Sequence, residues 1–176
     1  HQGHLDVMLL LLNRGAAVNQ ATNDDFTPLS IAAHQGHFDV LLLLLDSGAA
    51  VNHANNDGFT PLFIAALQGH LDVVQLLLDR GAAVNQASND GSTLLLSAVH
   101  QGRLDVVQLL LKRGAAVNQA SNDGFTPLYI AVLLGRLDLV QLLLDRGAAV
   151  NQANAGPRCV IAASQNHLEI VQLLLD

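Results

Sequence analysis

The stretch SNDGFTPLYIAVLLGRLDLVQLLLDRGAAVNQA, residues 121–153, is a near copy of NNDGFTPLFIAALQGHLDVVQLLLDRGAAVNQA, residues 55–87. Further copies fill the rest of the chain. Equivalent positions recur at a constant step of 33 residues, as in Gly36, Gly69, Gly102 and Gly135. A fixed period of this length is the sequence signature of a solenoid, in which each copy stacks on its neighbours. The repeat therefore decides the fold.

The first half of each copy carries the signals of a short helix. Thr60 is a suitable N-cap residue, and Pro61 follows at the first helical position, where its missing N–H costs nothing. The apolar sequence PLFIAALQ, residues 61–68, then predicts a helix that ends at Gly69.

The second half of each copy predicts another helix and an arm. LDVVQLLLD, residues 71–79, is apolar over most of its surface, and Asp72 lies in its first turn, where the helix dipole favours an anion. Gly81 then offers a left-handed C-cap. AAVNQASNDGF, residues 115–125, predicts an extended arm that ends in an Asn-Asp-Gly turn. Helices this apolar are expected to be buried between neighbouring layers.

Three motifs recur in register along the chain: Gly-x-Thr-Pro-Leu, Gly-His-Leu-Asp-Val-Val and Gly-Ala-x-Val-Asn. In these motifs the chain resembles the ankyrin repeat family over essentially its whole length. The resemblance implies one all-α domain over residues 1–176, an ankyrin-type helical solenoid of stacked helix-turn-helix repeats with β-turn or hairpin arms. It also implies a concave groove, formed by the arms and first helices, where partners of this family commonly bind.

The register of the motifs sets the repeat boundaries. We expect a partial repeat over 1–23, full repeats over 24–56, 57–89, 90–122 and 123–155, and a terminal helix pair over 156–176. The opening HQGH matches HQGH at 34–37, so the partial repeat holds a second helix and an arm but no first helix.

Several copies depart from the family pattern. The His that usually follows Thr-Pro-Leu, and braces the helix start by hydrogen bonding, is replaced here, so packing is expected to take over its role. The third repeat has lost its Pro at Leu94 and gained Ser97 in an apolar helix, and the last repeat, GPRCVIAA, lacks the Thr cap. These two places are predicted to be the least regular. The residues in the place of the His are Ser30, Phe63, Leu96 and Tyr129.

The sequence lacks the constellation of unlike groups that catalysis requires. It contains no phosphate-binding glycine loop and no His-Glu-x-x-His motif. His34 and His37 stand at a spacing that would suit a metal, but the alternative is that His37 packs beside Gly36 and His34 faces the groove. Cys159 replaces a core Leu and is expected to be a buried, inert thiol. We expect no enzyme activity, no cofactor and no metal.

Positions that vary between copies are freed from the shared packing. In the family these positions are the turn tip, the residue before Thr and the last two residues before the mid-repeat Gly, and all of them face the groove. The resemblance thus implies a partner-binding surface of Asp24, Phe26, His34, Gln35, Asp57, Phe59, Leu67, Gln68, Asp90, Ser92, His100, Gln101, Asp123, Phe125, Leu133 and Leu134.

Two interpretations stay open for two groups within this set. Each Phe either contacts a partner or packs on a neighbouring arm. Each Asp at a turn tip either attracts basic partners or stabilises its own turn by bonding to the backbone, and both roles can hold.

One further position, on the second helix, also varies between copies and lies outside this set. It holds Gln75, Gln108, Gln141 and Gln172 in the later copies, but Leu9 and Leu42 in the first two. This apolar spot predicts self-association at the N-terminal end.

We interpret the chain as a non-catalytic module that binds another protein or peptide, either a basic segment or one with apolar anchors. The formal charge of −7 argues against nucleic acid, and the longest leucine-rich run, 40–45, is too short to span a membrane. The alternatives are a structural spacer within a longer array and an engineered repeat scaffold, although a designer would have idealised the irregular repeats. One cysteine and no signal-peptide pattern favour an intracellular protein, in the cytoplasm rather than the nucleus.

Overall fold

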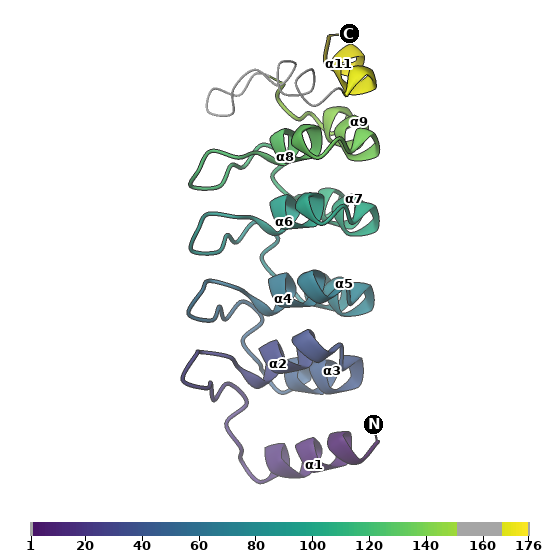
Figure 1. The fold of residues 1–176 in the computed structure, drawn as a ribbon. Coiled ribbons are helices and arrows are strands. Elements are labelled where there is room, and N and C mark those ends of the chain that lie inside the picture. Colours follow the sequence, from purple (N-terminus) through teal and green to yellow (C-terminus); the bar gives the residue numbers. More distant parts are fainter. Residues whose placement is uncertain (1, 151–166, 176) are drawn as a thin grey trace. The chain divides into compact units, whose positions relative to one another are not determined.

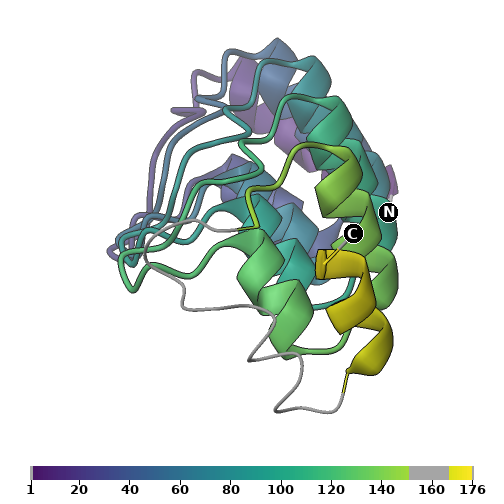
Figure 2. The ribbon, with the colours of Figure 1, turned by 90° about the horizontal axis from the view of Figure 1, so that it is seen from above.

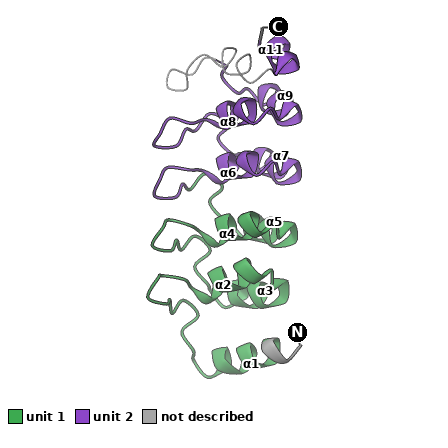
Figure 3. Cartoon of the chain, in the orientation of Figure 1, with its two compact units in different colours: residues 1–86 green, residues 87–176 purple. Residues whose placement is uncertain are grey.

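The computed structural model describes residues 2–150 and 167–175, and over these ranges the elements are helices joined by turns, with no strand. The chain divides into two compact units, residues 1–86 and residues 87–176 (Figure 3). Each unit is built from helix pairs with arms that project from one side of their own pair (Figure 2). None of the described helices is long and apolar enough to cross a membrane.

Unit 1 contains the single helix α1 and the helix pairs α2–α3 and α4–α5 (Figure 1). In the first pair α2 packs on α3, and in the second α4 packs on α5. The layers are joined because α2 packs on α4, α3 on α5 and α1 on α3. The helices are α1 (Gln2–Asn13), α2 (Pro28–Gln35), α3 (Phe38–Asp46), α4 (Pro61–Gln68) and α5 (Leu71–Asp79).

Unit 2 repeats the same arrangement. α6 packs on α7 and on α8, α8 packs on α9, and α9 also contacts α7 and α11. The helices are α6 (Leu94–His100), α7 (Leu104–Lys112), α8 (Pro127–Leu133), α9 (Leu137–Asp145) and α11 (Leu168–Leu175). The last repeat's motif GPRCVIAA, which is predicted to be irregular, and Cys159 lie outside the described residues.

The helix starts follow the predicted capping chemistry. In every described first helix the hydroxyl of the preceding Thr accepts a hydrogen bond from the N–H three residues on, at 3.2 Å. Because Thr93 still caps α6, the loss of Pro at Leu94 leaves the start of that helix in place. The bounds of α4 and α5 agree with the prediction, but α1 begins at Gln2, three residues ahead of Leu5, the position equivalent to the start of α3.

Two features of the structure require glycine at the mid-repeat position. Gly36 closes α2 at φ 69°, a left-handed conformation that side chains rarely adopt. The ring of His70, from the next repeat, lies only 2.6 Å from the place where a Cβ would stand. Any larger residue would therefore be strained and would displace His70.

A recurring asparagine joins neighbouring repeats. Asn52 Oδ1 accepts a hydrogen bond from the N–H of Ala83 at 2.8 Å, and its Nδ2 lies 3.5 Å from the carbonyl oxygen of Gly81. Asn19 and Asn118 make the same pair of contacts to the repeats that follow them. The sequence showed only that this Asn keeps the step of 33 residues; its bridging role needs the structure, because the two partners lie about thirty residues apart in the chain.

Candidate partner-binding surface

An apolar stripe runs along α8 in unit 2. The ring of Phe125, just before the cap Thr126, stacks on Tyr129 with a centroid distance of 5.2 Å and an angle of 24°. Leu133 lies four residues further on and so falls on the same side of the helix, with Leu134 beside it at the helix end. Phe125, Leu133 and Leu134 are 39%, 38% and 41% exposed, and we name these three residues the α8 patch.

The equivalent apolar stripe along α4 in unit 1 is less exposed to solvent. Phe59 packs on Phe63, with ring centroids 4.8 Å apart, and Phe63 is buried. Phe59 and Leu67 are each half-buried. Phe59 and Phe125 therefore each contact an aromatic ring of the helix that follows them, a third arrangement beside the two that the sequence left open. The α8 stripe exposes more apolar surface than the α4 stripe at the same positions.

The residues that replace the bracing His differ in how they act. At Phe63 and Tyr129 aromatic packing takes the place of hydrogen bonding, as predicted. At Ser30 the prediction of packing alone is wrong, because the Ser30 hydroxyl makes a 3.0 Å hydrogen bond with the hydroxyl of Thr27. Ser30 is buried, so this bond also gives its hydroxyl a partner.

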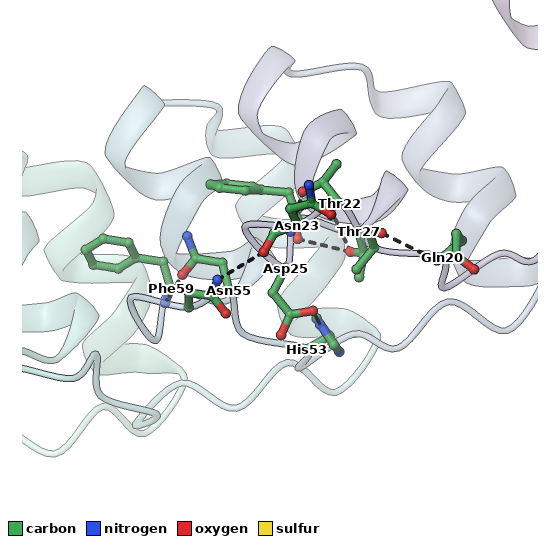
Figure 4. A network of polar contacts seen from close by, with 12 residues as sticks. Gln20, Thr22, Asn23, Asp25, Thr27, His53, Asn55 and Phe59 are labelled. Carbon is green, nitrogen blue, oxygen red and sulfur yellow. Dashed lines mark hydrogen bonds and ion pairs between the residues drawn. The ribbon is translucent and has the colours of Figure 1, made fainter.

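In three of the described arms, a side chain at the start of the turn fixes the residue before the Thr cap, as Figure 4 shows for two of them. The side-chain oxygen accepts a hydrogen bond from the backbone N–H four residues on. This bond fixes the backbone position of the residue that carries the aromatic ring. The acceptor and donor pairs are Thr22 and Phe26 at 3.1 Å, Asn55 and Phe59 at 2.8 Å, and Ser121 and Phe125 at 3.3 Å.

The third arm is built differently, around Asp90. Its Oδ1 accepts hydrogen bonds from the Ser88 hydroxyl at 2.6 Å and from the Ser92 N–H at 3.1 Å, and its Oδ2 accepts one from the Ser92 hydroxyl at 2.9 Å. These bonds, the one from Ser88 above all, hold the pKa of the Asp90 carboxyl below its ordinary value of 3.8. Asp90 thus stabilises its own turn, one of the two roles predicted for these residues.

None of the predicted partner-binding residues is buried, and each unit carries eight of them. In unit 1 the exposed ones are Asp24, His34, Gln35, Asp57 and Gln68, and the half-buried ones are Phe26, Phe59 and Leu67. In unit 2 Asp90, His100, Gln101, Asp123, Phe125, Leu133 and Leu134 are exposed, and Ser92 is half-buried.

The histidines near the mid-repeat glycine serve packing between repeats. Nε2 of His70 lies 3.1 Å from the carbonyl oxygen of His34, and its ring covers Gly36. The ring over Gly36 is thus that of His70, the residue equivalent to His37 in the following repeat. Across the described parts of the chain, no three His, Cys, Asp or Glu side chains are placed to hold a metal ion.

These features define a helical repeat protein with exposed, variable positions on its arms and first helices. A family model of ankyrin repeats, in three copies, matches residues 1–88 and 80–154. The chain belongs to the ankyrin repeat family, which confirms the predicted all-α repeat fold. Ankyrin repeats generally mediate protein–protein interactions and are typically non-catalytic. A comparison with curated proteins gives no match.

Proposed function

We propose that the chain is a non-catalytic protein-binding module and that the α8 patch is its main anchor site. The observation that supports this is the exposure of three large apolar side chains at the two ends of α8, at positions that vary between copies. Single exposed apolar residues are ordinary on protein surfaces, but a group of them on a common face is typical of an interaction site.

The chemistry of the surface indicates the kind of partner. Apolar side chains of a bound protein or peptide would pack on the patch, and both apolar surfaces would lose their contact with water. Anchor residues supply affinity in this way. Asp123 is exposed at the tip of the arm, two residues before Phe125, and the chain carries a formal charge of −7. A partner segment with apolar anchors beside Lys or Arg fits this combination, and charge attraction would speed the encounter.

Unit 1 would contribute a weaker set of contacts. Its equivalent residues are Asp57, Phe59 and Leu67, of which the two apolar ones are half-buried. The self-association predicted for the N-terminal end rests on Leu9, which is exposed, and Leu42, which is half-buried. It stays a prediction that light scattering can test.

A pull-down with three baits separates this proposal from a passive spacer. The baits are the chain itself, a Phe125→Ala, Leu134→Ala double variant and a Gln108→Ala variant, changed at an exposed position of α7. A binding module captures a defined protein with the first and third baits and loses it with the second. Equal capture by all three baits, or none by any, contradicts the proposal.

A further inference from the structure

Three arms of the chain carry the sequence Asp-Gly at their tips, at 57–58, 90–91 and 123–124. Here the Asp carboxyl group stands next to the nitrogen of a residue without a Cβ, which can approach it closely. The Gly nitrogen can attack the Asp Cγ, the N–H proton and the carboxyl hydroxyl leave as water, and a five-membered succinimide forms. Water then opens the ring at the α-carbonyl carbon, so that the chain runs through Cβ and Cγ. The product is isoaspartate, whose mass equals that of the original residue.

Two of these tips have the same local sequence. GAAVNQASNDG stands both at 81–91 and at 114–124, and the residue that follows is Ser92 in one arm and Phe125 in the other. Any difference in reactivity between the two Asp residues therefore depends on that following residue and on the folded structure.

The folded structure holds the carboxyl of Asp90 in place. Its Oδ1 accepts hydrogen bonds from Ser88 and Ser92, and its Oδ2 accepts another from Ser92. The Asp90 carbonyl oxygen also accepts a bond from the N–H of Asn122 at 3.0 Å, and the Asn122 side chain lies directly against Gly91. Ring closure would have to break these contacts. The lowered pKa of Asp90 acts in the same direction, because ring closure expels the hydroxyl of a protonated carboxyl.

The carboxyl of Asp123 has no such restraint. It is exposed, and among the described residues no hydrogen bond or ion pair holds it. Ser121, the equivalent of Ser88, uses its hydroxyl oxygen to accept a bond from the N–H of Phe125 at 3.3 Å instead. In both arms the N–H of the Gly donates to the carbonyl oxygen of this Ser at 2.9 Å, so that bond slows the two reactions alike.

We propose that Asp123 forms isoaspartate spontaneously in the folded chain and that Asp90 is protected from the same change. The reaction adds a methylene to the backbone two residues before Phe125 and thereby displaces the ring that begins the α8 patch. This consequence for partner binding rests on the proposed function of the patch, whereas the isomerisation itself needs no partner.

Asp57 should react more slowly than Asp123. Its carboxyl is exposed and has no hydrogen bond among the described residues. Its turn is more restrained, however, because Asn55 Oδ1 accepts hydrogen bonds from the N–H of Asp57 at 3.1 Å and from that of Phe59 at 2.8 Å.

Peptide mapping of the aged chain tests the proposal. Trypsin cuts after Lys and Arg and so places the three sites in separate peptides, 15–80, 81–103 and 114–136. The folded chain is aged in mildly acidic buffer, digested, and treated with an isoaspartate methyltransferase and labelled S-adenosylmethionine. Label should accumulate in 114–136 and more slowly in 15–80. It should appear in 81–103 at least about tenfold more slowly than in 114–136, since releasing a carboxylate from one hydrogen bond costs about that factor.

Three controls assign the difference to the fold. The isolated peptides 81–103 and 114–136, aged in the same way, should form isoaspartate at similar rates because their local sequence is the same. Ser92→Phe removes the Ser92 hydroxyl and should raise the rate at Asp90. Asp123→Glu should abolish the label in 114–136, because the longer side chain does not close a five-membered ring on the Gly124 nitrogen.

Equal labelling of 81–103 and 114–136 in the folded chain would overturn the proposal. So would labelling of the isolated peptide 114–136 with none in the folded chain. An unchanged rate at Asp90 in Ser92→Phe, with the helical circular dichroism intact, would show that the hydrogen bonds from Ser92 do not protect it.

Discussion

Nε2 of His53 lies 3.1 Å from Oδ1 of Asp25, and the two side chains point toward each other between neighbouring arms (Figure 4). Asp25 has φ 64° and is the one non-glycine with positive φ in the described ranges. The other copies have Gly at its position, namely Gly58, Gly91 and Gly124, and they have Gln at the position of His53, as in Gln20, Gln86 and Gln119. Two departures from the repeat pattern thus meet in space.

A double-mutant cycle tests whether these two departures are coupled. Asp25→Gly relieves the backbone strain but removes the contact, and His53→Gln removes the contact alone. Since both side chains are partly exposed, we expect a coupling energy of about 0.5 kcal/mol in urea unfolding at low salt, smaller at high salt. Strictly additive effects of the two changes would show that the pair contributes nothing.

Local signals made the helices predictable. Thr60, Pro61 and Gly69 act within a few residues of themselves, so the start and end of α4 follow from the sequence alone. The pairing of Asp25 with His53 could not be predicted in this way. In the sequence, each residue is a separate departure from the repeat pattern. Only the stacking of the two arms brings the two side chains into contact.

Asn52→Ala should destabilise unit 1 by about 1 kcal/mol, because the variant loses the hydrogen bond to the N–H of Ala83 and the contact to Gly81. Asn52→Asp keeps an acceptor for the Ala83 N–H and should retain more of the stability. Urea unfolding of the two variants measures the difference. If Asn52→Ala unfolds at the same midpoint as the unchanged chain, the bridge does not join the repeats energetically.

Ser97→Ile should stabilise unit 2 by about 1 kcal/mol. Ser97 is half-buried, and the same position holds Ile130 in α8, which is buried, so the larger side chain gains apolar contact. The reverse change, Ile130→Ser, serves as the matched control and should destabilise the unit. An unfolding midpoint that Ser97→Ile leaves unchanged would contradict this expectation.

The turn of the third arm should weaken in acid. Because folding lowers the pKa of Asp90, its carboxylate adds stability above the ordinary value of 3.8, and this contribution is lost as the pH falls below that value toward the folded pKa. The difference in urea midpoint between the chain and Asp90→Ala should therefore be full at neutral pH and shrink below 3.8. A difference that is the same at every pH would mean that these hydrogen bonds do not favour the charged form.

The candidate surface was only partly predictable. The repeat pattern marks Phe59 and Phe125 as equivalent, yet their exposure differs. What each Phe packs on, Phe63 in one case and Tyr129 in the other, appears only once the rings are placed. The assignment of Asp90 to its own turn likewise depends on Ser88 and Ser92, which the general Asn-Asp-Gly pattern does not specify.

The central claim is that a partner binds through the α8 patch. It is tested most directly by the dissociation constant of a captured partner, measured by calorimetry for the chain, for Phe125→Ala with Leu134→Ala, and for Gln108→Ala. Loss of the two anchors should weaken binding by about 2 kcal/mol, roughly thirtyfold, with the helical circular dichroism unchanged, and Gln108→Ala should bind as the chain does. Weaker binding by Gln108→Ala, together with unchanged binding by the double variant, would contradict the account and place the partner on the second helices.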